Sequence, residues 1–208
     1  ACASKWPPRW SARTTSGSRR SARRSRWSRY YPYYRCLEEG FDVTIAAPSV
    51  KKIQTVVHDF IDGVDTYTEK PGYGLQANAS FEEIKPEKYD GLIIPGGRAP
   101  EYIRLNEHIP GIVAHFFEAN KPIAAVCHAA QIFAVIPEVI KGRELTAYIA
   151  CKPEVQVAGG TYIDETLHKD GNLISGHAWP DLPGLMKEFL VKLPILLVIL
   201  ACGPLSAK

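Results

Sequence analysis

The chain has 208 residues, of which 46% are hydrophobic and 23% are charged. This length is enough for one globular domain with a single hydrophobic core, so we predict one domain over residues 1–208. The composition excludes a disordered protein, a collagen-like repeat and a coiled coil.

The formal net charge of +3 is unevenly distributed along the chain. Residues 1–35 hold ten of the 25 basic residues and none of the 22 acidic ones, which leaves residues 36–208 with a charge of −7. A mildly acidic body offers no field that attracts nucleic acid. We therefore expect no nucleic-acid partner.

The five cysteines are an odd number and lack the paired spacing of zinc ligands. This pattern disfavours a disulfide framework and a structural metal site, and it favours a reducing compartment. The N-terminus lacks the apolar stretch of a signal peptide, so we expect a cytoplasmic location. The apolar run at residues 193–202 is too short for a bilayer span and contains Pro194, which predicts a buried terminal helix or strand and no membrane segment.

From residue 40 onward the sequence alternates between predicted strands and helices. Residues 41–47 are apolar and β-branched and end at Pro48, which predicts a strand. Residues 50–80 are polar, contain three glycines and lack a sustained period, which predicts short hairpin-like pieces or an excursion from the sheet.

The remaining elements follow the same alternation. Buried strands are predicted at residues 89–95, 122–126, 145–150 and 172–175, and helices at residues 101–119, 129–136 and 182–191. The helix within 101–119 is expected to begin near Pro110, because proline is tolerated in the first turn. This order indicates an α/β fold with a doubly wound, mostly parallel sheet sandwiched by helices.

Two features fall at the carboxyl ends of predicted strands. Gly96 and Gly97 follow the strand at 89–95, and Cys127 follows the strand at 122–126. Ligands of doubly wound sheets bind beyond this edge. The sequence therefore predicts a functional site there.

Cys127 lies at the junction of a buried strand and a helix, which is the position of a nucleophile elbow. A helix N-terminus stabilises thiolate, so Cys127 is expected to be reactive at neutral pH. The alternative is a small buried cysteine that packs beneath the helix.

Three neighbours complete the predicted site. His128 follows the nucleophile as a candidate base, and Glu101 could either orient that imidazole or favour a helix N-terminus by its charge. The backbone N–H groups of Gly97 and His128 could hold an oxyanion.

The other histidines are weaker candidates. His177 follows the strand at 172–175 at the same edge and could line the pocket, although packing within a loop is the alternative. The rest lack metal-ligand spacing and are assigned surface or capping roles: His58, His108, His115 and His168. We predict no metal and no cofactor.

Residues 91–101 and 125–131 together resemble the ThiJ/PfpI superfamily. The resemblance spans roughly residues 36–190, because it continues through 141–143, 146–148, 158–160 and 178–180. It implies a flavodoxin-like fold similar to class I glutamine amidotransferases. It also implies a homo-oligomer, which is a dimer, trimer or hexamer.

In PfpI-like intracellular proteases the elbow cysteine acts with the next histidine and a glutamate from a neighbouring subunit. The resemblance thus implies a catalytic group of Cys127, His128 and Glu101, and our main hypothesis is a cysteine hydrolase that attacks the carbonyl of a peptide or amide. One alternative is a glutathione-independent glyoxalase or protein deglycase that acts on a small carbonyl compound. Another is a stress-response chaperone or redox sensor without turnover.

The N-terminal residues depart from the family pattern. The resemblance places an acidic residue near the nucleophilic sulfur, and Ser28 stands at that position. A doubly wound sheet needs a buried central strand, yet residues 12–22 are rich in arginine. We therefore predict that the identities of residues 1–35 are misassigned. We expect a central strand within 12–22, a helix near 27–39, and the backbone at Ser28 facing Cys127.

Overall fold

The computed structural model describes residues 27–59, 61–193 and 197–202. Its strands are β1 (Asp42–Ala47), β2 (Lys52–Asp59), β3 (Thr68–Gln76), β4 (Ala79–Ser80), β5 (Gly91–Ile94), β6 (Ile123–Val126), β7 (Glu144–Leu145), β8 (Thr161–Tyr162), β9 (Leu167–Asp170), β10 (Leu173–Gly176) and β11 (Leu197–Ala201). Its α-helices are α2 (Trp27–Glu38), α3 (Ala99–Ile103), α4 (His108–Glu118), α5 (Ala130–Phe133), α6 (Pro137–Ile140), α7 (Lys152–Val157) and α8 (Leu182–Lys192). Short 3-10 turns are η1 (Pro86–Lys88), η2 (Cys127–Ala129), η3 (Ile149–Cys151) and η4 (Trp179–Asp181).

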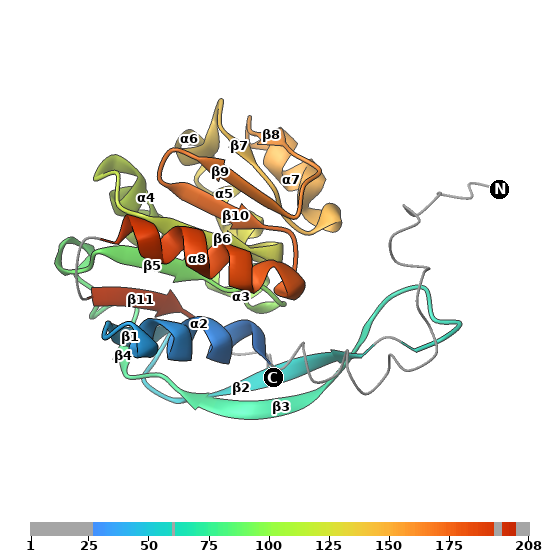
Figure 1. The fold of residues 1–208 in the computed structure, drawn as a ribbon, viewed down its shortest axis with the longest axis horizontal. Helices are drawn as coiled ribbons and strands as arrows, with labels where there is room; N and C mark the ends of the chain where they lie inside the picture. Colours follow the sequence, from blue (N-terminus) through green and yellow to red (C-terminus); the bar gives the residue numbers. More distant parts are fainter. Residues whose placement is uncertain (1–26, 60, 194–196, 203–208) are drawn as a thin grey trace.

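Within these residues a seven-stranded sheet has the order β4-β1-β11-β5-β6-β10-β9. Every neighbouring pair is parallel except β9 with β10. Helices cover both faces, with α2 and α8 side by side on one of them (Figure 1). This arrangement confirms the predicted flavodoxin-like fold class. The short β7 and β8 pair with each other in a separate sheet.

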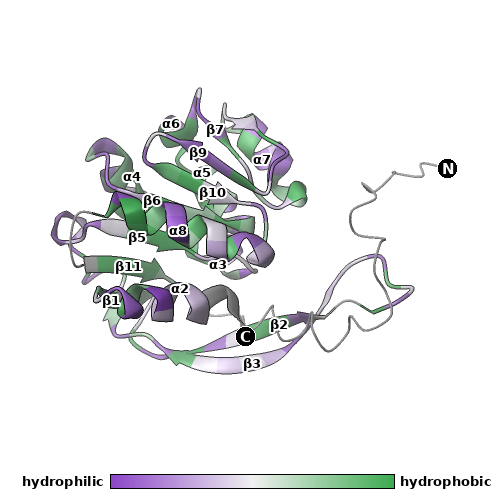
Figure 2. Ribbon diagram, in the orientation of Figure 1, coloured by the Kyte–Doolittle hydropathy of each residue, from purple (hydrophilic) through white to green (hydrophobic). Residues whose placement is uncertain are grey.

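The hydrophobic core lies on both sides of the central strands. Strands β5, β6 and β10 are buried at every position, which is typical of parallel strands covered by helices on both faces. Phe116 of α4 and Phe133 of α5 pack on one face, and Met186 and Phe189 of α8 pack on the other. Figure 2 shows these central strands as mainly hydrophobic, whereas α2 and α8 mix hydrophobic and polar residues.

Most of the predicted elements are confirmed, including the strands near 41–47, 89–95, 122–126 and 172–175 and the helices near 27–39 and 182–191. Residues 101–119 form two helices rather than one, with Pro110 in the first turn of α4 as expected. The strand predicted at 145–150 is wrong beyond Leu145, because the Tyr148 N–H donates to the Cys127 carbonyl, 3.1 Å away, and residues 149–151 turn.

Strand β11 occupies the centre of the sheet. It pairs in parallel with β1 on one side and with β5 on the other, and Val198, Ile199 and Leu200 are buried. The apolar run near the C-terminus therefore forms a buried strand. The central strand predicted within residues 12–22 lies outside the described residues, and the position between β1 and β5 is held by β11. The predicted misassignment within residues 1–35 stays a prediction.

Strands β2 and β3 form one long antiparallel hairpin, which we call the arm (Lys52–Gln76). The arm crosses beneath the main sheet and projects beyond it (Figure 1). Residues 50–80 were predicted as short hairpin-like pieces or as an excursion from the sheet, and the structure shows a single excursion. The Tyr30 hydroxyl of α2 donates to the carbonyl of Gly74 in the arm, 2.5 Å away. None of the described helices combines the length and apolar composition that crossing a bilayer requires.

We predict that Ile199→Ala lowers the free energy of unfolding by about 2–4 kcal/mol, because it leaves a cavity at the centre of the sheet. The matched control is Val191→Ala on α8, which removes two methyl groups from a residue that is 81% exposed and should change stability by less than about 0.5 kcal/mol. Urea unfolding monitored by circular dichroism measures both. Equal small losses would show that residues 197–201 do not fill the sheet centre.

Candidate active site

Cys127 adopts a strained backbone conformation directly after β6, with φ of 62°. This left-handed value is uncommon for a residue other than glycine and is typical of a sharp functional turn. Gly96 makes the turn possible, because a Cβ placed on it would lie 2.4 Å from the Cys127 Cβ and 2.9 Å from the Val126 carbonyl oxygen. The loop after β5 and the elbow after β6 therefore fit together only with glycine at position 96.

Two backbone N–H groups, those of Gly97 and His128, are directed at the Cys127 sulfur as hydrogen-bond donors. Gly97 has φ of 79°, which glycine adopts without strain. These are the two donors that the sequence suggested for an oxyanion. Their role toward a bound substrate stays a prediction.

Burial dominates the ionisation of the thiol. It raises the pKa of Cys127 to about 11, and the N–H groups of Gly97 and His128 lower the pKa by less than burial raises it. The pKa of this thiol is therefore raised rather than lowered, contrary to the expectation drawn from the helix N-terminus. The following helix α5 has only four residues, so its dipole is weak, and Cys127 is only 8% exposed.

His128 is the immediate partner of the sulfur. Its Nδ1 lies 3.2 Å from the Cys127 Sγ, and its ring stacks on Tyr148 with centroids 5.0 Å apart. The pKa of His128 is lowered, first by burial and then by the charge of His58. The imidazole is therefore neutral at pH 7 and can accept the thiol proton.

Glu101 is held by Arg98 within one chain. Its Oε2 lies 3.7 Å from the Arg98 Nε, and its side chain is 39% exposed. Its charge acts to raise the pKa of His128, but among the described residues no hydrogen bond joins the two side chains. A hydrogen bond between Glu101 and His128 across a subunit contact stays a prediction.

His177 joins the site through a ring stack. Its ring lies 5.9 Å from that of Tyr148, at an interplanar angle of 16°, so His128, Tyr148 and His177 form one series. Ser28 lies in α2, but its side chain is outside the described part of the chain. Whether its backbone faces Cys127 stays untested.

The arm contributes Tyr67 and Glu69, which the sequence did not single out, and His58, for which the expected surface or capping role is wrong because the residue is only 9% exposed. Tyr67 interacts electrostatically with Cys127, and its pKa is raised to about 12, first by burial and then by that cysteine. His58 stacks on Tyr67 with centroids 4.4 Å apart, and Glu69 lies 3.4 Å from the His58 Nε2. Residues 50–80 lack a sustained period, so the sequence carried no signal that this segment contributes to a site.

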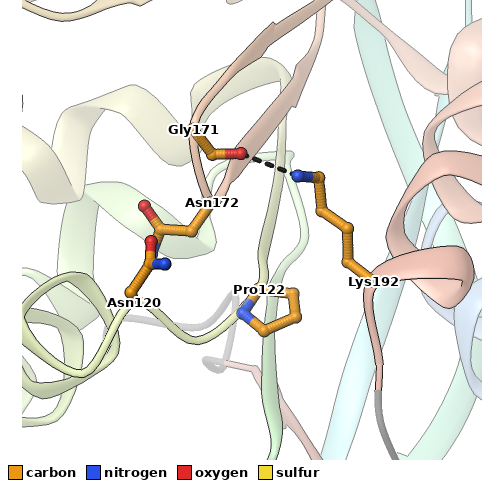
Figure 3. A pocket seen from close by; sticks show the side chains of 5 residues that line it. All are labelled: Asn120, Pro122, Gly171, Asn172 and Lys192. Carbon is orange, nitrogen blue, oxygen red and sulfur yellow. Dashed lines mark hydrogen bonds between the residues drawn. The ribbon is translucent and has the colours of Figure 1, made fainter.

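Two further observations concern metal sites and pockets. Among the described residues no group of three or more His, Cys, Asp or Glu could hold a metal ion. A pocket of about 390 Å³ is lined by Asn120, Pro122, Gly171, Asn172 and Lys192, with the Lys192 ammonium donating to the Gly171 carbonyl (Figure 3). Pro122 precedes β6, whereas Cys127 follows it, so this pocket lies at the opposite edge of the sheet.

The sequence and the fold of this chain are similar to those of known proteins. The model of the DJ-1/PfpI family matches residues 25–192. Protein DJ-1 homolog D from Arabidopsis thaliana is 41% identical over 75% of this chain and 42% of its own length, and Deglycase PfpI from Pyrococcus furiosus is 39% identical over 77% and 87%. The crystal structure of a two-domain protein with DJ-1/ThiJ/PfpI-like and ferritin-like domains from Anabaena variabilis superposes with a TM-score of 0.64 and 27% identity, over 77% of this chain and 42% of its own. This chain thus spans less than half of two of these three relatives.

We predict that Gly96→Ala destabilises the fold by about 1–3 kcal/mol and alters the alkylation rate of Cys127, because the added methyl group collides with the elbow. The control is Gly111→Ala in α4, where a Cβ meets nothing within 4 Å and helix propensity should increase stability slightly. Thermal unfolding and peptide mass spectrometry after iodoacetamide treatment measure both effects. An unperturbed Gly96→Ala protein would contradict the close packing of the two loops.

The alkylation rate of Cys127 should rise about tenfold for each pH unit between pH 7 and pH 10, because the pKa of this thiol is raised to about 11 and only the thiolate reacts. Peptide mass spectrometry follows Cys127 separately from the other cysteines. A rate that levels off by pH 7 would show instead that the site stabilises the thiolate.

Proposed function

The chain belongs to the DJ-1/PfpI family, and from this premise we propose that it is a cysteine-dependent deglycase that removes a small dicarbonyl adduct from an amino group. The observation that carries the proposal is the neutral pair of Cys127 and His128, 3.2 Å apart on the elbow beneath two N–H donors. The relative named Deglycase PfpI supports this choice of reaction.

The reaction can be written for a hemiaminal of methylglyoxal. His128 takes the thiol proton as the sulfur bonds to the carbinol carbon, and the breaking C–N bond releases the amine with that proton. This leaves a hemithioacetal on Cys127. The carbon that bears sulfur loses a proton and the neighbouring carbonyl carbon gains one, through an enediol, which gives a thioester.

Water then cleaves the thioester, which regenerates the thiol and releases a 2-hydroxy acid. One substrate carbon is oxidised while its neighbour is reduced, so no external oxidant is needed. The N–H groups of Gly97 and His128 are positioned beside the sulfur, where negative charge develops on an adjacent oxygen. Preorganised donors of this kind lower the barriers to the formation and to the hydrolysis of the thioester.

The hydrolase hypothesis shares the nucleophile but has less support. Cys127 and His128 are each only 8% exposed, which favours a small adduct at the end of a flexible side chain over a peptide backbone. The relative named a deglycase also favours the alternative reaction. Chaperone or redox-sensor activity, the homo-oligomer, the cytoplasmic location and the absence of a nucleic-acid partner stay predictions.

We expect Cys127→Ala to lower the release of 2-hydroxy acid from a methylglyoxal adduct of N-acetyllysine by about 10³-fold or more, because it removes the sulfur that forms the thioester. Cys36→Ala is the matched control, since Cys36 is a buried cysteine of α2 that interacts electrostatically with Arg35 rather than with Cys127. The control should retain wild-type turnover.

Free methylglyoxal at the concentration in equilibrium with the adduct must be assayed in parallel, because its isomerisation gives the same acid. A faster reaction with the adduct supports a deglycase, and equal rates support a glyoxalase. Cleavage of fluorogenic peptides without reaction of either carbonyl substrate would restore the hydrolase hypothesis. Turnover that survives in Cys127→Ala would contradict every one of these reactions.

A further inference from the structure

The arm brings a second imidazole to the edge of the sheet where Cys127 lies. His58, near the end of β2, is 9% exposed, and its ring is 4.4 Å from Tyr67 and 6.2 Å from Trp179. Trp179 begins η4, just beyond the carboxyl end of β10, and β10 is the neighbour of β6. The contact with Trp179 therefore fixes the end of the arm beside the strand ends that carry the nucleophile.

A chain of charges links this imidazole to the loop that follows β5. The His58 Nε2 lies 3.4 Å from one Glu69 oxygen, and the other Glu69 oxygen lies 3.5 Å from Arg98. Arg98 directly follows Gly97, one of the two donors directed at the sulfur. Glu69 thus lies between an imidazole and a guanidinium, and a carboxylate in such contact favours the charged form of an imidazole.

The two imidazoles have opposite environments. His128 is buried, no carboxylate of the described residues is in hydrogen-bond contact with it, and the charge of His58 further disfavours its protonation. His58 contacts a carboxylate. The titratable groups that face it include Glu69 from β3, Tyr67 from the loop before β3 and His128 from η2. When neighbouring titratable groups are driven toward different protonation states, one can act as an acid while the other acts as a base.

We propose that His58, positioned by Glu69, transfers protons to and from the substrate oxygens. His128 transfers protons to and from the substrate carbons and takes the proton of the sulfur. This inference rests on the proposed deglycase function. As His128 removes the proton from the sulfur-bearing carbon of the hemithioacetal, the His58 imidazolium gives a proton to the neighbouring carbonyl oxygen, and an enediol forms. His58 then takes the proton from the hydroxyl on the sulfur-bearing carbon, and His128 returns its proton to the adjacent carbon. The product is the thioester, and both imidazoles regain their starting states.

The test compares His58→Gln, Glu69→Gln and the double variant with His168→Gln. His168 is the matched control because it also lies within 3.3 Å of carboxylates, those of Glu144 and Glu165, but on the outer strand β9. We expect kcat on the N-acetyllysine adduct to fall about 10²-fold in His58→Gln and about tenfold in Glu69→Gln, which is the range of general acid–base catalysis. The double variant should match His58→Gln, because Glu69 acts through His58.

The pH profile separates proton transfer from a structural role. The wild-type kcat should fall at alkaline pH as the imidazolium is lost. Glu69→Gln should move this fall to lower pH because the carboxylate no longer stabilises the charged ring, and His58→Gln should abolish it. Alkylation of Cys127 by iodoacetamide should stay at the wild-type rate in all three variants, because His58 does not take the proton of the free thiol.

Three results would overturn the inference: wild-type kcat in His58→Gln, an unchanged alkaline fall in Glu69→Gln, or a loss of Cys127 alkylation that parallels the loss of kcat. The last of these would assign the arm a structural role. Failure of the proposed function is distinguishable, because it would appear as full turnover in Cys127→Ala whatever the behaviour of His58→Gln.

Discussion

The left-handed backbone of Cys127 is the constraint on which the rest of the site depends. Holding a residue other than glycine at φ of 62° costs on the order of 1–3 kcal/mol, so the surrounding structure must enforce it. The buried β6 fixes the approach, the Tyr148 N–H holds the Cys127 carbonyl, and Gly96 leaves room for the Cys127 Cβ. The sulfur is consequently fixed at the carboxyl edge of the sheet, beneath the N–H of Gly97.

The same packing determines how the sulfur must react. A thiol with a pKa near 11 is mostly protonated at neutral pH, so efficient turnover needs a base that takes its proton. A neutral, buried imidazole 3.2 Å away is suited to that transfer, whereas a surface-exposed histidine would be partly charged. Burial thus suppresses unspecific reaction of the thiol and favours substrates small enough to enter. The arm completes this enclosure, with Tyr67 and His58 beside the elbow.

Short sequence patterns predicted the strands and turns that depend only on residues close together in the chain. The uniformly apolar runs that became β5, β6 and β10 and the glycines after β5 were enough to place Cys127 at a strand end. The central position of β11 was not predictable from its sequence, because an apolar run such as that from Val198 to Ala201 fits any buried strand and only the sheet order assigns its neighbours. The raised pKa of Cys127 was missed because it depends on burial by distant segments. His58 and Glu69 were missed because they meet only when the arm folds, and ten residues of the chain separate them.

The sulfur of Cys127 is expected to form a covalent bond to the carbonyl-derived part of the substrate during turnover. Acid quenching during reaction with the methylglyoxal adduct, followed by peptide mass spectrometry at acidic pH, detects that bond. We expect a three-carbon acyl unit on the peptide that contains Cys127, its release by hydroxylamine, and its absence when Cys127 is replaced by alanine. A modification confined to other cysteines, or turnover without any acyl unit on Cys127 at any quench time, would contradict the covalent mechanism.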